Sequence, residues 1–205
     1  MYYEIDIAGK KRNLQLYEAG ENVDIAAFIL FGDVEITQHA ARKLLEKAPD
    51  FDIMLTAEAK SIPLIYEMAR QAGMNDYIVA RKGVKVYMEN VLSVEVKSIT
   101  TDHIQHLYLG DNEVSRIKGK KVLIIDDVIS TGESLAAMEE LVKEAGGITA
   151  GKMTVLAEGD AKNREDIIFL GELPLFDGQG HVKSTLTKSY NCSKIRICGH
   201  FPQIF

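Results

Sequence analysis

The sequence predicts an α/β protein with a mainly parallel sheet flanked by helices. Apolar runs of strand length alternate with amphipathic segments of helix length, in the order strand–helix–strand, β-hairpin, strand–helix–strand. The run Val122–Ile125 is apolar at every position, which is typical of a strand buried on both faces of a parallel sheet. A chain of 205 residues with no Pro- or Ser-rich linker and no repeat favours one domain, residues 1–205.

The N-terminal part begins with strand-like segments and ends with a helix. Short strands are expected at Tyr2–Ile7 and Asn13–Tyr17, and an apolar segment follows at Ile25–Phe31. The spacing of apolar residues predicts a helix over Ile36–Lys47, which Pro49 ends.

A strand–helix–strand unit follows. Phe51–Ala57 is its first expected strand. Ser61 is the expected N-cap of the helix, Pro63 fits the first turn, and Gly73 ends the helix. Tyr77–Ala80 is the second expected strand.

The second half of the chain is predicted to hold a hairpin and another strand–helix–strand unit. Strand candidates at 84–98 and 104–109 are followed by an expected turn at 110–112. Beyond the buried strand, a helix is expected over Ser134–Ala145 and a strand over Ile148–Leu156.

Composition and charge exclude several classes of protein. Hydrophobic residues make up 46% of the chain, but no apolar run reaches membrane-spanning length, and Met1–Asp6 lacks the features of a signal peptide. The net charge of −6 disfavours a nucleic-acid surface. From residue 181 the chain shows no clear period; it contains Cys192 and Cys198, which we expect to be free thiols because zinc needs four closely spaced ligands. We therefore expect a cytoplasmic protein with neither a membrane nor a nucleic-acid partner.

The segment 122–134 carries the strongest chemical signal. Asp126 and Asp127 follow the buried strand at its carboxyl end, where open α/β sheets bind ligands. The turn Ser130–Ser134 combines hydroxyls, small side chains and free N–H groups at a helix start, a pattern that cradles phosphate. Paired carboxylates beside a phosphate site suit a sugar phosphate, with the acids holding its diol oxygens or a Mg²⁺ ion. An ordinary strand–helix unit with a capped helix is the alternative.

Two other strand ends carry groups that bind anions. Ala59 and Lys60 offer main-chain N–H groups and one cation, although an ordinary turn between strand and helix has the same pattern. Arg81 and Lys82, with Lys85 nearby, have the charge to neutralise a diphosphate, and arginine is shaped for bidentate contact. Solvated surface charge is the alternative for these three cations.

The segment 122–134 resembles the phosphoribosyl pyrophosphate (PRPP) signature of the type I phosphoribosyltransferases. That signature has four apolar residues, two acids, two apolar residues and a Ser/Thr-Thr-Gly turn, in the order found here. The resemblance extends over residues 28–176. It implies a Rossmann-like core at 36–176, a small N-terminal hood at 1–35 and a flexible β lid, with 177–205 as an extension of unassigned role.

The same resemblance implies roles around the sugar phosphate. The residues implied to bind the 5′-phosphate are Ser130, Thr131, Gly132, Glu133 and Ser134. Asp126 and Asp127 are implied to hold the ribose hydroxyls, directly or through Mg²⁺-bound water. Glu133 replaces a glycine that most adenine enzymes have, and we expect its side chain to point away because an acid is unfavourable beside phosphate.

Further resemblances concern pyrophosphate and the lid. In the family, the loop after the first core strand grips pyrophosphate, often with a cis peptide, and Ala59–Lys60 is the matching pair. The pair Arg81–Lys82 is similar to an Arg-Lys pair in adenine and xanthine enzymes. Residues 84–101 match the lid that excludes water. Glu95 takes the place of a glutamate near the reacting base, with an exposed hairpin carboxylate as the alternative. Val96 replaces the tyrosine that usually follows this glutamate.

The base pocket has weaker signals. Phe31 belongs to a segment similar to the hood of adenine enzymes and is expected to stack on the base, with a plain core phenylalanine as the alternative. Gly32 stands where the family has arginine, and Glu158 is expected to border the base.

Together the resemblances imply a purine phosphoribosyltransferase that acts on PRPP with Mg²⁺, favours adenine and forms a homodimer. A xanthine or hypoxanthine enzyme and a non-catalytic, PRPP-sensing regulator of the same fold are the open alternatives.

Overall fold

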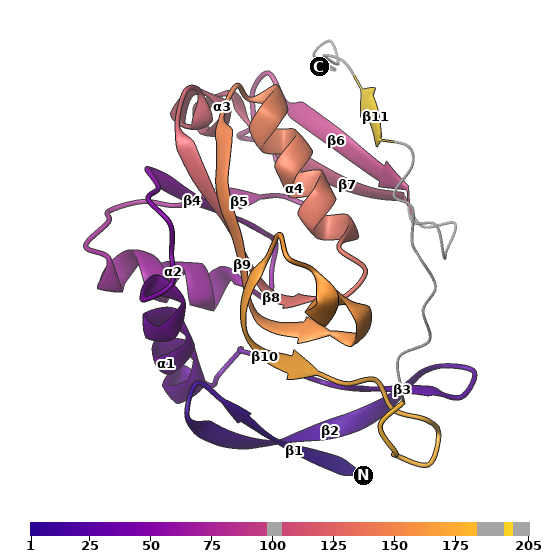
Figure 1. Ribbon diagram of the computed structural model, residues 1–205. Helices are drawn as coiled ribbons and strands as arrows, with labels where there is room; N and C mark the ends of the chain where they lie inside the picture. Colours follow the sequence, from indigo (N-terminus) through magenta and orange to yellow (C-terminus); the bar gives the residue numbers. More distant parts are fainter. Residues whose placement is uncertain (98–103, 184–194, 199–205) are drawn as a thin grey trace.

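A parallel five-stranded sheet forms the centre of the protein (Figure 1). The computed structural model describes residues 1–97, 104–183 and 195–198. The strand order is β10-β9-β8-β4-β5, and every neighbouring pair is parallel. The strands are β4 (Ile53–Ala57), β5 (Ile78–Ala80), β8 (Lys121–Ile129), β9 (Ile148–Glu158) and β10 (Ile168–Leu173). The predicted α/β fold with a mainly parallel sheet is confirmed.

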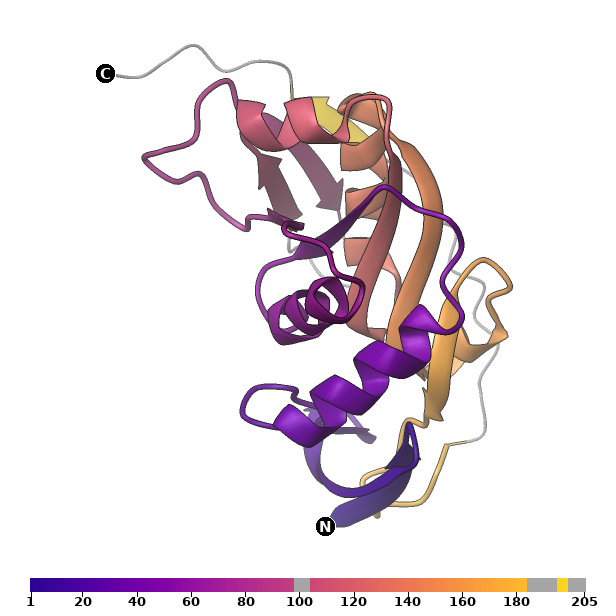
Figure 2. The same ribbon diagram turned by 90° about the vertical axis from the view of Figure 1, so that its left-hand side faces the viewer.

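Helices cover both faces of this sheet. α1 (Val34–Leu45) and α2 (Ile62–Gln71) lie on one face, toward the viewer in Figure 2, and α4 (Glu133–Glu144) lies on the other. The side chains of β8 alternate between the two resulting cores: Leu123 faces the first and Ile124 the second, and both are fully buried. Each such burial contributes about 1.5–3 kcal/mol. The predicted strand buried on both faces is therefore confirmed.

A small antiparallel sheet is formed by the N-terminal residues. Its order is β1-β2-β3, with β1 (Tyr2–Ile7), β2 (Lys10–Gly20) and β3 (Val23–Ala26). Its buried side chains belong to the same core as those of α1 and α2. Two backbone hydrogen bonds of 2.9 Å join Asp24 to Phe176, which ties this sheet to the segment after β10.

The start of α1 is fixed to the N-terminal sheet by charge. The Asp33 carboxylate accepts the Ile36 N–H at 3.1 Å as the helix N-cap, and it accepts Nε of Arg12 at 2.6 Å. Arg12 lies on β2, so one carboxylate both begins the helix and anchors the small sheet beside it.

A second antiparallel sheet packs beside α4. Its order is β11-β6-β7, with β6 (Leu92–Lys97), β7 (Ile104–Leu109) and β11 (Ile195–Cys198). The predicted hairpin is confirmed, but its first strand begins at Leu92, because bends and turns occupy much of residues 82–90. Residues 98–101 of the predicted lid at 84–101 lie outside the described residues, as do Cys192 and the rest of 184–194.

The turn expected at 110–112 is wrong. This segment begins a helix, α3 (Asp111–Ile117), for which Gly110 is the N-cap. The Glu113 carboxylate accepts the Gly110 N–H at 3.0 Å, and this reach-back contact stabilises the first turn of a helix. The 3-10 helix η1 (Gly159–Asn163) and β10 also had no counterpart among the expected elements.

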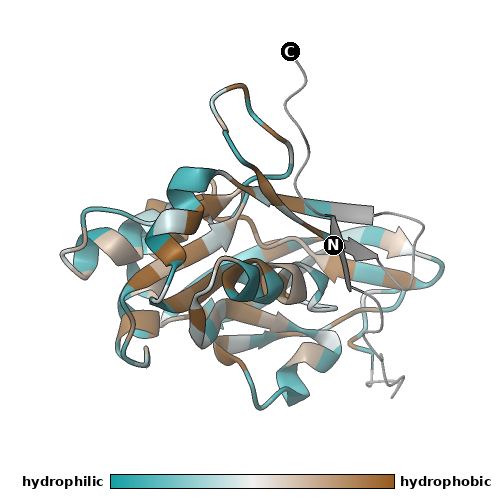
Figure 3. Cartoon of the chain, turned by 90° about the horizontal axis from the view of Figure 1, so that it is seen from above, coloured by the Kyte–Doolittle hydropathy of each residue, from teal (hydrophilic) through white to brown (hydrophobic). Residues whose placement is uncertain are grey.

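Hydropathy follows the layers of the fold. Figure 3 shows hydrophobic residues along the strands and hydrophilic residues along much of the outer helix surface. Within the described ranges, no helix has the length and apolar character to cross a membrane.

Candidate active site

The predicted site residues gather where the parallel strands end. Strands that run in the same direction bring their carboxyl ends to the same edge of a sheet. Asp126 and Asp127 lie near the end of β8, Glu158 ends β9, and the residues after β4 and β5 include Lys60 and Arg81. Four adjacent strands therefore supply candidate site residues at one edge.

The two aspartates have different environments. Asp126 lines a pocket, whereas Asp127 is only 5% exposed. The Oδ2 atom of Asp127 is buried and has no hydrogen-bond partner among the described residues. The carboxylates are therefore neighbours: Asp126 lies at the pocket, and Asp127 is covered by surrounding atoms.

Ser61 connects both aspartates. Its Oγ donates to Oδ1 of Asp126 at 2.7 Å, accepts the Asp127 N–H at 2.9 Å and lies 3.1 Å from Oδ1 of Asp127. Ser61 is the N-cap residue of α2, as expected, but it is 1% exposed and its side chain makes no capping hydrogen bond. A serine before a helix is typical of a capping residue, so no sign of another role is visible in the sequence. The contact of Ser61 with Asp126 joins residues 65 positions apart and has no local signature.

Burial and like charge set the protonation of this pair. Burial, followed by the charge of Asp127, raises the pKa of Asp126 to about 7, while the Ser61 hydrogen bond acts in the opposite direction. A cation beside the pair would relieve both unfavourable effects.

The acid pair has the donor set that a magnesium ion shared with a substrate phosphate would need. No group of three or more His, Cys, Asp or Glu side chains in the described part of the chain could hold a metal ion. Mg²⁺ commonly binds one or two protein carboxylates and takes its other ligands from substrate phosphates and water. Asp126 and the unpartnered Oδ2 of Asp127 fit that pattern.

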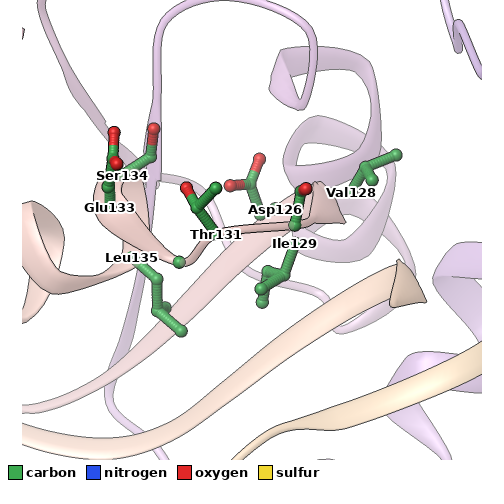
Figure 4. Close-up of a pocket in the computed structure, with 9 residues that line it drawn as sticks. Asp126, Val128, Ile129, Thr131, Glu133, Ser134 and Leu135 are labelled. Atoms are coloured by element: carbon green, nitrogen blue, oxygen red, sulfur yellow. The ribbon is translucent and has the colours of Figure 1, made fainter. Parts of the chain in front are cut away.

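A pocket of about 120 Å³ begins at Asp126 and continues to the start of α4 (Figure 4). Since a water molecule occupies about 30 Å³ in the liquid, this volume suits a phosphate group. Its lining residues are Asp126, Val128, Ile129, Ser130, Thr131, Gly132, Glu133, Ser134 and Leu135. Gly132 is the N-cap of α4 and has a left-handed φ of +81°, which a glycine adopts without strain. The first N–H groups of an α-helix lack carbonyl partners within the helix, and this end of a helix is where anions bind in many proteins.

The side chain of Glu133 lies at this pocket. It is one of the lining residues, and Figure 4 shows its carboxyl group on the same side of the loop as the Ser134 and Thr131 hydroxyls. The expectation that this side chain points away is therefore not confirmed.

The predicted pyrophosphate residues surround Glu58. The Glu58 carboxylate accepts the Lys82 N–H at 3.1 Å and lies 3.3 Å from Nη1 of Arg81. The Lys82 N–H, then the charges of Lys85 and Arg81, hold the pKa of Glu58 below its ordinary value. The sequence interpretation missed Glu58, although it adjoins the pair Ala59–Lys60.

The cis peptide in this loop joins Glu58 to Ala59. The resemblance had matched the bond between Ala59 and Lys60, so the expected position is wrong by one residue. The Glu58 N–H donates to the Ala80 carbonyl at 2.9 Å, and the Ala59 carbonyl accepts the Ile62 N–H at 3.2 Å. These bonds fix the loop between β5 and α2.

Glu158 lies beside the phosphate pocket. Strands β8 and β9 are in parallel register with Ile129 opposite Ala157, which places Glu158 next to Ser130. The Ser130 hydroxyl donates to the Glu158 carboxylate, and Lys60 is close enough to act on its charge. Burial raises the pKa of Glu158 against both influences.

Two further expected residues, from β6 and from the segment before α1, also lie outside the pocket lining. Glu95 lies within β6, in register with His106 of β7. Phe31 precedes α1 and is 54% exposed. Neither lines the phosphate pocket, and the roles expected for them stay predictions.

The chain is similar to known phosphoribosyltransferases. A family model described as the phosphoribosyl transferase domain matches residues 34–171. The adenine phosphoribosyltransferase of Petrotoga mobilis is 32% identical over 136 residues, covering 63% of this chain and 72% of the relative. The hypoxanthine/guanine phosphoribosyltransferase of Methanococcus voltae is 30% identical over 150 residues, 73% of each chain.

A solved structure shows the same fold. The adenine phosphoribosyltransferase of Saccharomyces cerevisiae superposes with a TM-score of 0.63 at 21% identity, covering 77% of this chain and 93% of the yeast protein. The matched family segment contains the acid pair, the phosphate pocket and the strand ends around Glu58. This chain belongs to the phosphoribosyltransferase domain family.

Proposed function

We propose that this protein is a purine phosphoribosyltransferase. It transfers the 5-phosphoribosyl group of PRPP to a ring nitrogen of a purine and releases pyrophosphate, with adenine as the favoured base. The observation that carries this proposal is the pocket that runs from Asp126 to the N–H groups at the start of α4. One carboxylate of the acid pair, Asp126, and the phosphate-binding turn 130–134 line the same pocket, and together they match the two ends of a ribose phosphate.

The residues of the cup bind the 5′-phosphate. The N–H groups and hydroxyls at the start of α4 hold this group, and the left-handed Gly132 makes the turn that brings them together. Asp126 binds the ribose hydroxyls, and Asp127 supports it from the buried side. Negative charge below the sugar favours the positive charge that develops at C1 as its bond to pyrophosphate breaks.

Pyrophosphate leaves toward the ends of β4 and β5. The cations proposed to bind it are Lys60, Arg81, Lys82 and Lys85, three of which act on Glu58. Asp126 and Asp127 would hold Mg²⁺, which would supply further charge neutralisation for the departing group. Ser61 holds the acid pair in place for both tasks.

The remaining assignments complete this proposal. Residues 1–35 form the hood, with Phe31 against the base, and Glu158 borders the base from β9. The lid around Glu95 excludes water from the activated sugar. A cytoplasmic homodimer is the proposed form of the protein.

A hypoxanthine or guanine enzyme is the second candidate, favoured by the similarity to the Methanococcus voltae relative. A PRPP-sensing regulator without catalytic activity is the third.

A base panel tests the proposal. Purified protein is incubated with PRPP, Mg²⁺ and each of adenine, hypoxanthine, guanine, xanthine and orotate, and pyrophosphate release is measured. Release with adenine above the other bases supports the proposal, and preference for hypoxanthine or guanine supports the second candidate. Tight PRPP binding without turnover of any base would support the third candidate, a PRPP-sensing regulator.

A further inference from the structure

An arginine outside the expected site touches the phosphate loop. Arg164 follows the 3-10 helix η1, which comes after β9. A Cβ atom built on Gly132 would collide with Nη1 of Arg164 and would lie 3.6 Å from its Cζ. The guanidinium group therefore packs directly over the glycine that turns the chain into α4.

Hydrogen bonds hold this guanidinium group in one orientation. Its Nε and Nη2 donate to the two carboxylate oxygens of Asp166 at 2.9 and 2.7 Å. Asp166 also accepts Nζ of Lys152 at 2.6 Å, and Lys152 pairs with Glu139 of α4 at 3.0 Å. Asp166 holds the Nε and Nη2 atoms of the guanidinium group, and the Nη1 atom lies next to Gly132.

We propose that Arg164 is a phosphate-binding residue that supplies the positive charge of the cup at the start of α4. This inference rests on the function proposed above. Arg164 is not among the residues that line the pocket, but its guanidinium group contacts Gly132, the turn residue next to the N–H groups that receive the phosphate. A partly buried cation on this turn attracts a phosphate dianion bound there.

The carboxylate of Glu133 in the phosphate pocket explains why a positive charge is needed there. Glu133 lines the pocket and would repel a phosphate dianion. The guanidinium group of Arg164 packs on Gly132, the residue before Glu133. Its positive charge offsets the negative charge of the Glu133 carboxylate. The side chain of Arg164 is 31% exposed, so solvent screens this interaction only in part.

The position of Arg164 in the sheet order also indicates which phosphate group it binds. Arg164 follows the strand β9, whereas Arg81 and Lys82 follow β5, and strands β8 and β4 lie between them. Arg164 thus binds the sugar 5′-phosphate and leaves pyrophosphate to the cations around Glu58.

Two binding measurements on the whole protein test this division. Isothermal titration with ribose 5-phosphate and, separately, with pyrophosphate and Mg²⁺ compares wild type with Arg164→Met. We expect the variant to bind ribose 5-phosphate at least about tenfold more weakly, with pyrophosphate within about twofold. Lys143→Met, which removes one charge at the far end of α4, is the matched control and leaves both affinities unchanged.

Arg164→Lys keeps the proposal testable if the methionine variant does not fold. A lysine has the charge but cannot bond Asp166 and reach Gly132 together, so intermediate ribose 5-phosphate affinity is expected. Unchanged ribose 5-phosphate binding in a folded variant, or equal loss for both ligands, overturns the role of Arg164. Wild-type protein that does not bind ribose 5-phosphate contradicts the proposed function instead.

Discussion

The Oγ atom of Ser61 lies 2.7 Å from Oδ1 of Asp126 and holds the loop after β4 against the end of β8. The same oxygen accepts the main-chain N–H of Asp127. One hydroxyl therefore aligns both acids of the proposed active site, and it does so from the segment that also carries Glu58 and Lys60.

Replacing Ser61 with alanine tests this alignment. We expect Ser61→Ala to lower kcat/KM for PRPP by about tenfold to a hundredfold, because a hydrogen bond to a charged group is lost and the Asp127 N–H loses its partner. The assay is pyrophosphate release with the preferred base. Ser115→Ala, on the exposed side of α3, is the control and should match wild type. Full activity in Ser61→Ala would show that the acids are held in place by other contacts.

The second prediction concerns the inward acid. Asp127→Asn should reduce turnover by at least about a hundredfold while the fold is retained, because a neutral amide binds Mg²⁺ more weakly than a carboxylate and cannot balance positive charge at C1. Circular dichroism and thermal melting check the fold, and pyrophosphate release checks turnover. The exposed Asp111→Asn serves as the control. An Asp127→Asn protein with normal turnover would make this carboxylate a structural group.

The third prediction is a pH dependence of stability. The pKa of Asp126 is about 7 in the folded protein, against about 3.9 for an unfolded aspartate. The folded state then binds more protons than the unfolded state between these values, so stability contributed by this group falls as pH rises from about 4 to about 7.

Thermal melting without metal, in the presence of a chelator, measures this effect. Asp126→Asn should melt at least about 2 °C above wild type at about pH 8, and the difference should disappear near pH 4. Equal melting temperatures at the higher pH would contradict a raised pKa at Asp126.

The fourth prediction concerns pyrophosphate. Glu58→Gln should strengthen Mg²⁺-pyrophosphate binding by about threefold to tenfold, because glutamine can still accept the Lys82 N–H while its negative charge is gone. Titration calorimetry at low and high salt is the measurement, and the gain should shrink at high salt. Glu18→Gln, an exposed change on β2, is the control. Weaker binding in Glu58→Gln would mean that its charge is needed to position Arg81.

Local sequence patterns were sufficient for the central sheet and the phosphate loop. The run Val122–Ile125 is buried on both faces as expected, and Ser130–Ser134 lines a pocket next to Asp126. These features depend on neighbours in the chain: apolar residues in series, then small and hydroxyl residues at a helix start.

Features that depend on distant residues were missed. Ser61 contacts Asp126 across 65 positions and Arg164 packs on Gly132 across 32, and neither contact has a periodic or local signature. The sequence predicts a turn where α3 begins, because Gly110 suits both a turn and a helix N-cap. The contact between the Glu113 carboxylate and the Gly110 N–H favours the helix. Long-range side-chain contacts follow from the packed fold, which a single sequence does not display.

The strand β11 shields the outer edge of β6, whose other edge pairs with β7. A shortened chain that ends at residue 183 would leave that edge bare, with its N–H and carbonyl groups unpaired. Bare edges recruit strands from other molecules, so such a truncation should lower solubility before it alters chemistry at the acid pair.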